Sequence, residues 1–96
     1  MTFRFLSPAQ QELAEAMEHY DRAAPGLRLE FLDEVERTIR RILLHPQGWT
    51  RVSEHHRRCR TRRFPYGVIY AIDGDTLLIT AVMDLRRHPD TWKGRL

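Results

Sequence analysis

The sequence predicts an α+β fold, with an N-terminal strand, a helical hairpin and a twisted antiparallel sheet of three C-terminal strands. Apolar residues recur mainly every three or four positions up to residue 44, as they do on one face of a helix, and long β-rich runs follow residue 63. The chain of 96 residues is 42% hydrophobic and 30% charged, which is typical of a globular domain and leaves no room for a second. Residues 1–96 are therefore expected to form one domain.

The N-terminal quarter predicts a strand followed by a helix. Phe3 and Phe5 occupy alternate positions within residues 1–6, as in a half-buried strand. The sequence Ser-Pro-Ala-Gln at 7–10 has the pattern of a capping box, with serine as the N-cap and proline at the first helical position. The sequence Ala-Pro-Gly at 24–26 is expected to end this helix, because proline disfavours helical backbone in the residue before it.

A second, longer helix is expected from Leu27 until the sequence His-Pro-Gln-Gly at 45–48 ends it. In both helices the large apolar residues fall on one face, which indicates that this face packs against the sheet. The residues expected to form that contact are Leu13, Met17, Tyr20, Phe31, Val35, Ile39 and Ile42.

The C-terminal half predicts three strands. Residues 64–72 and 76–83 are β-rich, and the Asp-Gly-Asp sequence at 73–75 favours a hairpin turn between them. Both runs are apolar on both faces, which suggests central strands with helices on one side and another cover on the opposite side. Residues 57–63 are expected to pair as the third strand, with an arginine stripe of Arg58, Arg60 and Arg62 on one face.

Basic residues are concentrated in the C-terminal half. The formal net charge is +3, and residues 51–96 carry 10 basic and 5 acidic residues, whereas residues 1–50 carry 6 and 8. Arginine suits bidentate contacts to phosphate, so a surface that handles phosphate groups is one interpretation. The other is that the stripe binds an acidic protein surface or counterions. The residues expected to contact a target or a phosphate group are Arg58, Arg60, Arg62, Arg86, Arg87, Lys93 and Arg95.

The sequence offers little for other chemistry. The glycines form no nucleotide-binding loop, and the adjacent His55 and His56 would point to opposite faces of a strand, so no cofactor or metal site is predicted. Cys59 is more typical of a small buried residue than of a nucleophile, and as the single cysteine it favours the cytoplasm. No apolar run approaches the ~18–20 residues that cross a bilayer, so no membrane partner is expected.

The runs at 64–72 and 79–95 resemble the RelE/ParE superfamily of bacterial toxins, on its ParE-like side. The first reads FPYGVIYAI and the second ITAVMDLRRHPDTWKGR, and the preceding helices and the Arg57-Arg58-Cys59 sequence keep the family's order. The resemblance covers essentially the whole chain. It implies a small cytoplasmic toxin of a type II toxin-antitoxin system, which inhibits growth and is neutralised by a cognate antitoxin in a hetero-oligomer. Inhibition of DNA gyrase by binding is the leading mechanism that it implies.

Departures from the RelE pattern bear on catalysis. RelE-type ribonucleases carry a basic residue after the strand tyrosine and a tyrosine near the C-terminus, where this chain has Gly67 and Trp92. ParE-like relatives often have histidine at the position of Asp84. Glycine and tryptophan offer no proton shuttle, so the prediction leans against an enzyme. The alternatives are a ribosome-dependent mRNA endonuclease, or an inactivated toxin that only binds antitoxin. The catalytic candidates for an endonuclease are Arg58, Arg60, Arg87 and His88.

Overall fold

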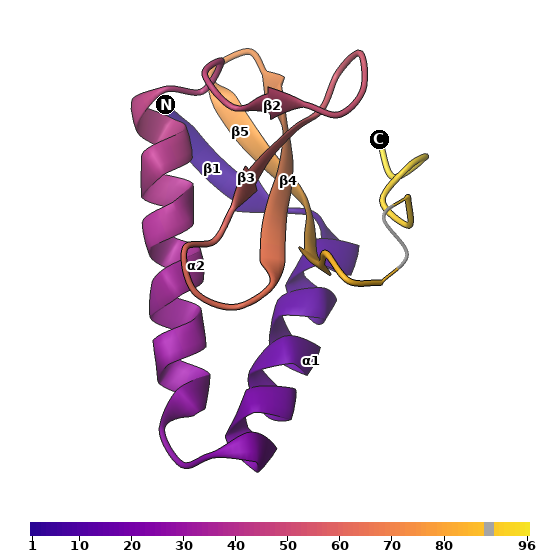
Figure 1. The fold of residues 1–96 in the computed structure, drawn as a ribbon. Helices are drawn as coiled ribbons and strands as arrows, with labels where there is room; N and C mark the ends of the chain where they lie inside the picture. Colours follow the sequence, from indigo (N-terminus) through magenta and orange to yellow (C-terminus); the bar gives the residue numbers. More distant parts are fainter. Residues whose placement is uncertain (88–89) are drawn as a thin grey trace.

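The computed structural model describes residues 1–87 and 90–96, and it shows two helices packed against one five-stranded sheet (Figure 1). The predicted α+β class is confirmed. Neither helix of the described chain is long and apolar enough to cross a membrane. In chain order the elements are β1 (Thr2–Phe5), α1 (Ser7–Ala23), α2 (Leu27–Leu44), β2 (Thr50–Arg51), β3 (Arg57–Arg60), β4 (Tyr66–Asp73) and β5 (Thr76–Asp84).

The two helices end where proline and glycine predict, but α1 begins differently. Leu6 is its N-cap, the Gln10 N–H donates to the Leu6 carbonyl at 3.0 Å, and no side chain caps the helix. The predicted capping box is therefore wrong, because Ser7 already belongs to the first helical turn. Between the helices Gly26 has φ of 82°, a left-handed conformation that glycine adopts without strain, and it lets the chain reverse quickly into α2.

The sheet has the strand order β1-β5-β4-β3-β2 and is mixed rather than purely antiparallel. β1 pairs in parallel with β5, whereas the remaining neighbours are antiparallel. The predicted set of three antiparallel strands is thus correct for β3, β4 and β5, and the predicted N-terminal strand is β1. The parallel pairing of β1 with β5 and the short edge strand β2 were not predicted. The hairpin is as predicted, since Asp73 pairs with Thr76 and Gly74 takes a positive φ of 58°.

Two strand boundaries lie inside the predicted ones. β3 ends at Arg60 and β4 begins at Tyr66, because the chain turns between them through Phe64, which has φ of 71°. β5 also contains a bulge, in which Thr80 is the extra residue between two consecutive pairs of the β4–β5 ladder. The bulge shifts the alternation by one residue, so that Ile79 and Val82 both reach the core beneath the helices.

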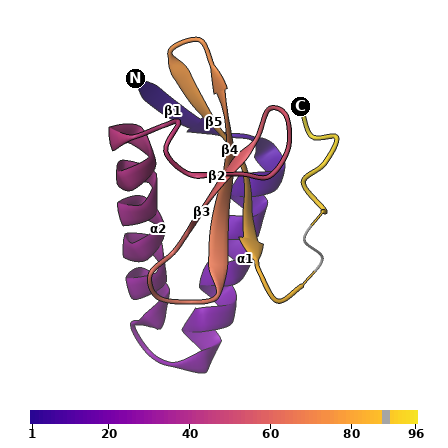
Figure 2. The same cartoon turned by 45° about the horizontal axis from the view of Figure 1, so that its top comes forward.

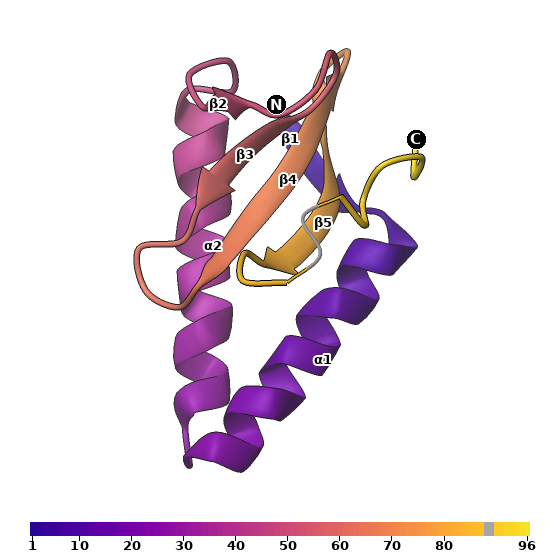
Figure 3. The same ribbon diagram turned by 45° about the vertical axis from the view of Figure 1, so that its right-hand side comes forward.

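The main core lies between the helices and one face of the sheet (Figure 3). Tyr20 and the four predicted residues of α2 are buried there, and Leu13 and Met17 are partly buried against them, so this part of the prediction is confirmed. Their partners are alternate residues of the central strands, chiefly Val68, Tyr70, Leu77, Ile79 and Val82. The helices therefore cover one face of the sheet, and the opposite face is called the open face below.

The open face is covered in part by the C-terminal segment, residues 90–96. After β5 this segment, yellow in Figure 2, runs back along the sheet. Trp92 is only 3% exposed and packs with Ile69, Ala81 and Met83. Val52 and Leu85 also pack against this cluster. The expectation that the central strands have a second cover opposite the helices is thus confirmed.

Candidate functional site

Alternation along β3 separates its residues between the two faces of the sheet. Cys59 is 1% exposed within the helix-side core, so Arg58 and Arg60 lie toward the open face. The ladder places Arg58 opposite Ile69 and Arg60 opposite Gly67. Because Ile69 also contacts the tryptophan cluster, the two arginines border the apolar patch that the C-terminal segment covers.

Arg58 differs from Arg60 in its surroundings. Arg60 is exposed, whereas Arg58 is half-buried and its Nε has no accessible surface and no hydrogen-bond partner among residues 1–87 and 90–96. A Cβ added to Gly67 would lie 3.2 Å from Arg58 Cγ and 3.1 Å from Leu85 Cδ2. The glycine therefore leaves the space in which the aliphatic stem of Arg58 crosses β4.

Arg62 does not belong to the arginine stripe. The strand ends two residues before it, and its side chain lies beside α2 in a cavity lined by Glu34, Arg37, Arg40 and Arg41. The buried carboxylate of Glu34 accepts hydrogen bonds from the backbone N–H groups of Arg62 and Arg63. This carboxylate fixes the turn after β3 against α2 and thereby carries Arg62 away from the open face.

The end of β5 carries a second group of arginines. Arg86 donates through Nε and Nη2 to the Asp84 carboxylate at 3.0 and 2.9 Å, and Arg87 Nε lies 3.9 Å from the same group. The hydrogen bonds from the Arg86 side chain lower the pKa of Asp84, and they raise the pKa of Arg86 in return. Arg87 is therefore the more available cation of the two for an external anion.

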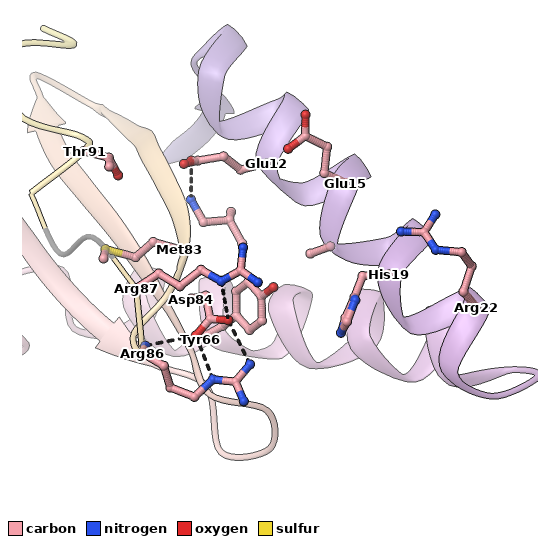
Figure 4. Close-up of a pocket in the computed structure, with 12 residues that line it drawn as sticks. Glu12, Glu15, His19, Arg22, Tyr66, Met83, Asp84, Arg86, Arg87 and Thr91 are labelled. Carbon is pink, nitrogen blue, oxygen red and sulfur yellow. Dashed lines mark hydrogen bonds and ion pairs between the residues drawn. The ribbon is translucent and has the colours of Figure 1, made fainter.

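A cavity of about 480 Å³ lies between α1 and the end of β5 (Figure 4). Carboxylates of Glu12 and Glu15 line one part of it, while His19 and Arg22 extend from the later turns of α1. The arginine pair at the end of β5 lines the opposite wall. The cavity thus joins acidic and basic groups, and its lining suits a charged peptide better than an apolar ligand.

The two remaining predicted cations have partners within the chain. Lys93 Nζ lies 3.2 Å from Asp90, and both side chains are exposed. Arg95 forms a two-pronged ion pair with Glu12, at 2.8 and 3.1 Å, and also donates to the Thr80 carbonyl at 3.0 Å. Lys93 remains accessible to a phosphate group, whereas the Arg95 guanidinium is already engaged.

The Glu12–Arg95 pair completes an edge of the sheet. β1 pairs with β5 only as far as Ile79, so the next part of the β5 edge has no neighbouring strand. There Glu12 Oε1 accepts from the Val82 N–H at 3.1 Å, and Arg95 donates to the Thr80 carbonyl. The pair therefore satisfies backbone groups that a strand would otherwise bind, and it ties the C-terminal segment to α1.

Burial shifts the pKa of several described groups that could carry a proton away from neutral pH. His56 is 8% exposed against Trp92, with ring centroids 4.7 Å apart, and burial lowers its pKa. Burial raises the pKa of Tyr66, and raises that of Tyr70 to about 12, on the helix side of the sheet. Burial likewise raises the pKa of the Cys59 thiol. His19 lines the cavity between α1 and the end of β5 together with Tyr66. The predicted candidate His88 lies outside the described residues.

Glu12 and Glu34 hold the elements of the candidate site in place, and the sequence prediction missed both. Both carboxylates bind backbone N–H groups of distant strands or turns, and neither belongs to a recognisable motif. The one available signal was their helical position, since Glu34 adjoins Phe31 and Val35 on the apolar face of α2. An acidic residue on such a face indicates a buried partner, although it does not identify the partner.

Comparison with known proteins assigns the fold to a family. The sequence profile described as "ParE toxin of type II toxin-antitoxin system, parDE" matches residues 3–89. Among solved structures, a chain of the chromosomal ParDE TA system from P. aeruginosa is similar with a TM-score of 0.78 and 19% sequence identity, over 88% of this chain and 96% of that chain. No curated protein sequence matches the chain significantly.

Proposed function

The chain belongs to the ParE toxin family of type II toxin-antitoxin systems, and on that basis we propose that it inhibits DNA gyrase by binding rather than by catalysis. It acts in the cytoplasm and is held inactive by a cognate antitoxin until the antitoxin is lost. The accessible cations of the open face and of the β5 end supply its contacts to an anionic target. These are Arg58, Arg60, Arg86, Arg87 and Lys93.

The packing of Trp92 and Gly67 is the observation that carries this proposal. These residues occupy the positions where RelE-type ribonucleases have a tyrosine and a basic residue. Trp92 is buried against the sheet, and Gly67 is covered by Arg58 and Leu85. Both positions serve packing, and neither residue can exchange a proton with a substrate. A general acid or base is typically worth ~10²- to 10⁴-fold in rate, so its loss favours a binding mechanism.

A site whose charged groups are mainly arginines fits a mechanism of binding without catalysis. A guanidinium has a pKa above ~12 and stays charged, so it can neutralise phosphate but cannot act as a general base. Arg60 is exposed at the end of β3, and Arg87 is exposed after the end of β5. The β3–β4–β5 ladder places both near the same end of the sheet, because Arg60 pairs with Gly67 and Gly67 with Met83.

Expression of the chain alone tests the proposal against the ribonuclease alternative. We expect an SOS response with continued protein synthesis at early times, because inhibited gyrase damages DNA before translation stops. An immediate arrest of protein synthesis, with mRNA cuts at codon spacing on translating ribosomes, would establish the endonuclease instead. Loss of those cuts in the His88→Ala variant would then assign the proton carrier.

The antitoxin part of the proposal has a separate test. A partner that binds only the folded chain stabilises it by about 2.7 kcal/mol at a hundredfold excess over Kd. We therefore expect the thermal midpoint of the purified chain to rise by roughly 10–20 °C when the product of the adjacent antitoxin gene is added, since about 4–8 °C corresponds to 1 kcal/mol in a domain of this size. An unchanged midpoint for a folded, monodisperse toxin would contradict the proposed neutralisation.

A further inference from the structure

A second group of arginines lies on the helix side of the molecule, apart from the open face. Arg37, Arg40 and Arg41 of α2 and Arg62 of the following turn line a cavity of about 300 Å³, together with Glu34. This group is called the α2 arginine cluster. Arg62 joins it because the turn after β3 is held to α2 by the Glu34 carboxylate. Two parts of the chain more than twenty residues apart thus direct guanidinium groups to one cavity.

The positive charges of this cluster are incompletely neutralised. Glu34 is the one carboxylate in the lining, and its Oε2 is already engaged by two backbone N–H groups. Arg37 pairs with Asp33 at 3.1 Å, but the structure gives the side chains of Arg40 and Arg62 no hydrogen bond or ion pair within the described chain. Like charges in one concave site repel one another, and an external anion would relieve this repulsion.

Arg41 is positioned in advance for such an anion. Its Nη2 donates to Thr38 Oγ1 at 2.9 Å and to the Arg60 carbonyl at 3.3 Å, while its planar group lies 6.0 Å from the Trp49 ring centre. Its Nε has no accessible surface and no partner within residues 1–87 and 90–96. The guanidinium is thus held in place by its Nη2 hydrogen bonds and by Trp49, which lowers the entropy lost when a ligand binds to its accessible part.

We propose that the α2 arginine cluster is a second anion-binding site, which takes the phosphate group of a nucleotide or of a nucleic-acid backbone. Several guanidinium forks converge on one cavity, and a phosphate group offers more acceptor oxygens than the two of a carboxylate. A volume of about 300 Å³ also lies at the lower limit of small-molecule sites, so a phosphate with an attached sugar fits its scale. The site is independent of the target that the toxin inhibits.

The open face and the α2 arginine cluster lie on opposite sides of the sheet at the end of β3. The Arg60 carbonyl accepts from Arg41 of the α2 arginine cluster, whereas the Arg60 side chain belongs to the open face. A nucleic acid bound to one surface is therefore separated from the other by the thickness of the sheet. This arrangement lets the two sites be tested separately, because charge can be removed from one without touching the other.

The test measures DNA binding after the open face has been neutralised. In an Arg58→Met/Arg60→Met background, fluorescence anisotropy with a short DNA duplex and a single strand of equal length is recorded across a salt series. We expect residual binding that weakens further in Arg40→Gln/Arg62→Gln, with the slope of log K against log salt reduced by roughly one for each lost phosphate contact. Arg28→Gln/Arg51→Gln is the control with equal charge, since both arginines are exposed and neither lines the cavity of the α2 arginine cluster.

Equal binding by the cluster variant and the control would overturn the proposal. Competition with pyrophosphate, AMP and a decaglutamate peptide then identifies the ligand. Displacement of the duplex by pyrophosphate or AMP at concentrations where the peptide has no effect supports a phosphate site, and stronger binding of AMP than of either DNA assigns a nucleotide. Displacement by the peptide at lower concentration than by the phosphates would assign the cluster to an acidic protein partner and contradict the proposal.

Discussion

The two faces of the sheet are built in different ways. On the helix side an aromatic cluster joins both helices to the chain before and within β4, with the Tyr20 ring centre 5.0 Å from that of Phe31 and 4.7 Å from that of Phe64. On the open face a small apolar group packs mainly against Trp92 of the C-terminal segment, which the Glu12–Arg95 pair joins to α1. Most apolar burial therefore depends on the helices, while the proposed target contacts lie beside the thinner cover.

This difference suggests that the helix-side core provides most of the stability, whereas the open face provides contacts to the target. A core formed by two long helices tolerates changes in surface charge, because exposed arginines contribute little to folding. The open face presents its cations next to the short C-terminal segment, which has no helix or strand among its described residues 90–96. Truncations of aromatic residues in the helix-side core should thus destabilise the chain most, whereas substitutions of the open-face arginines should mainly alter binding.

Removal of the central helix-side aromatic should have the largest effect. Phe31→Ala creates a cavity among rings that are in direct contact, and we expect a loss of about 3–5 kcal/mol in the free energy of unfolding. Leu29→Ala is the control on the same helix, because Leu29 is 65% exposed and its truncation should change stability by less than about 0.5 kcal/mol. Urea denaturation compares them, and similar losses for both variants would contradict the packing described.

Removal of Trp92 from the open face should lower the free energy of unfolding by less than removal of Phe31. Trp92→Ala is expected to destabilise the chain by about 2–3 kcal/mol, below the range for an enclosed aromatic, because the C-terminal segment can collapse onto the sheet. Trp92→Phe should recover more than half of that loss, whereas Lys93→Ala at the exposed neighbouring position should be nearly neutral. Calorimetry of the three variants provides the measurement. A larger loss for Trp92→Ala than for Phe31→Ala would reverse the comparison.

The Glu12–Arg95 ion pair should contribute less to the free energy of unfolding than either aromatic residue. Glu12→Gln removes the charge that binds Arg95 but keeps an acceptor for the Val82 N–H, so we expect a loss of about 1 kcal/mol. Asp33→Asn breaks the exposed pair with Arg37 and should cost less than about 0.5 kcal/mol. A double-mutant cycle of Glu12→Gln with Arg95→Met measures the coupling, and strictly additive losses would show that the pair does not hold the segment.

The helix side could be predicted because the sequence patterns that specify it involve residues close together in the chain. Periodic apolar residues and the proline-glycine breaks placed both helices, and the Gly74 turn placed the β4–β5 hairpin. The start of α1 was misplaced because the serine pattern at its N-terminus favours a cap one residue later than the chain adopts. Boundary errors of this size do not change which residues face the core.

The open face and the sheet edges depend on contacts between distant residues, which a single sequence does not reveal. Parallel pairing of β1 with β5 and the carboxylate of Glu12 at the β5 edge both join parts of the chain some seventy residues apart. Arg62 was assigned to the stripe by alternation alone, and the positive φ of Phe64 marks the turn that breaks the alternation. Candidate residues were therefore identified by type, while their grouping required the structure.

The central claim is that the open-face arginines inhibit gyrase by binding without supporting the fold. The most direct measurement is supercoiling by purified gyrase with the Arg58→Met/Arg60→Met variant, in which methionine retains the apolar stem that packs over Gly67. We predict that inhibition weakens roughly tenfold or more, since a hydrogen bond to a charged group is worth about 1.5–3 kcal/mol, while the thermal midpoint stays unchanged. The control Arg28→Met/Arg51→Met removes two exposed arginines outside the proposed contacts and should inhibit fully. Undiminished inhibition by the Arg58→Met/Arg60→Met variant would contradict the claim.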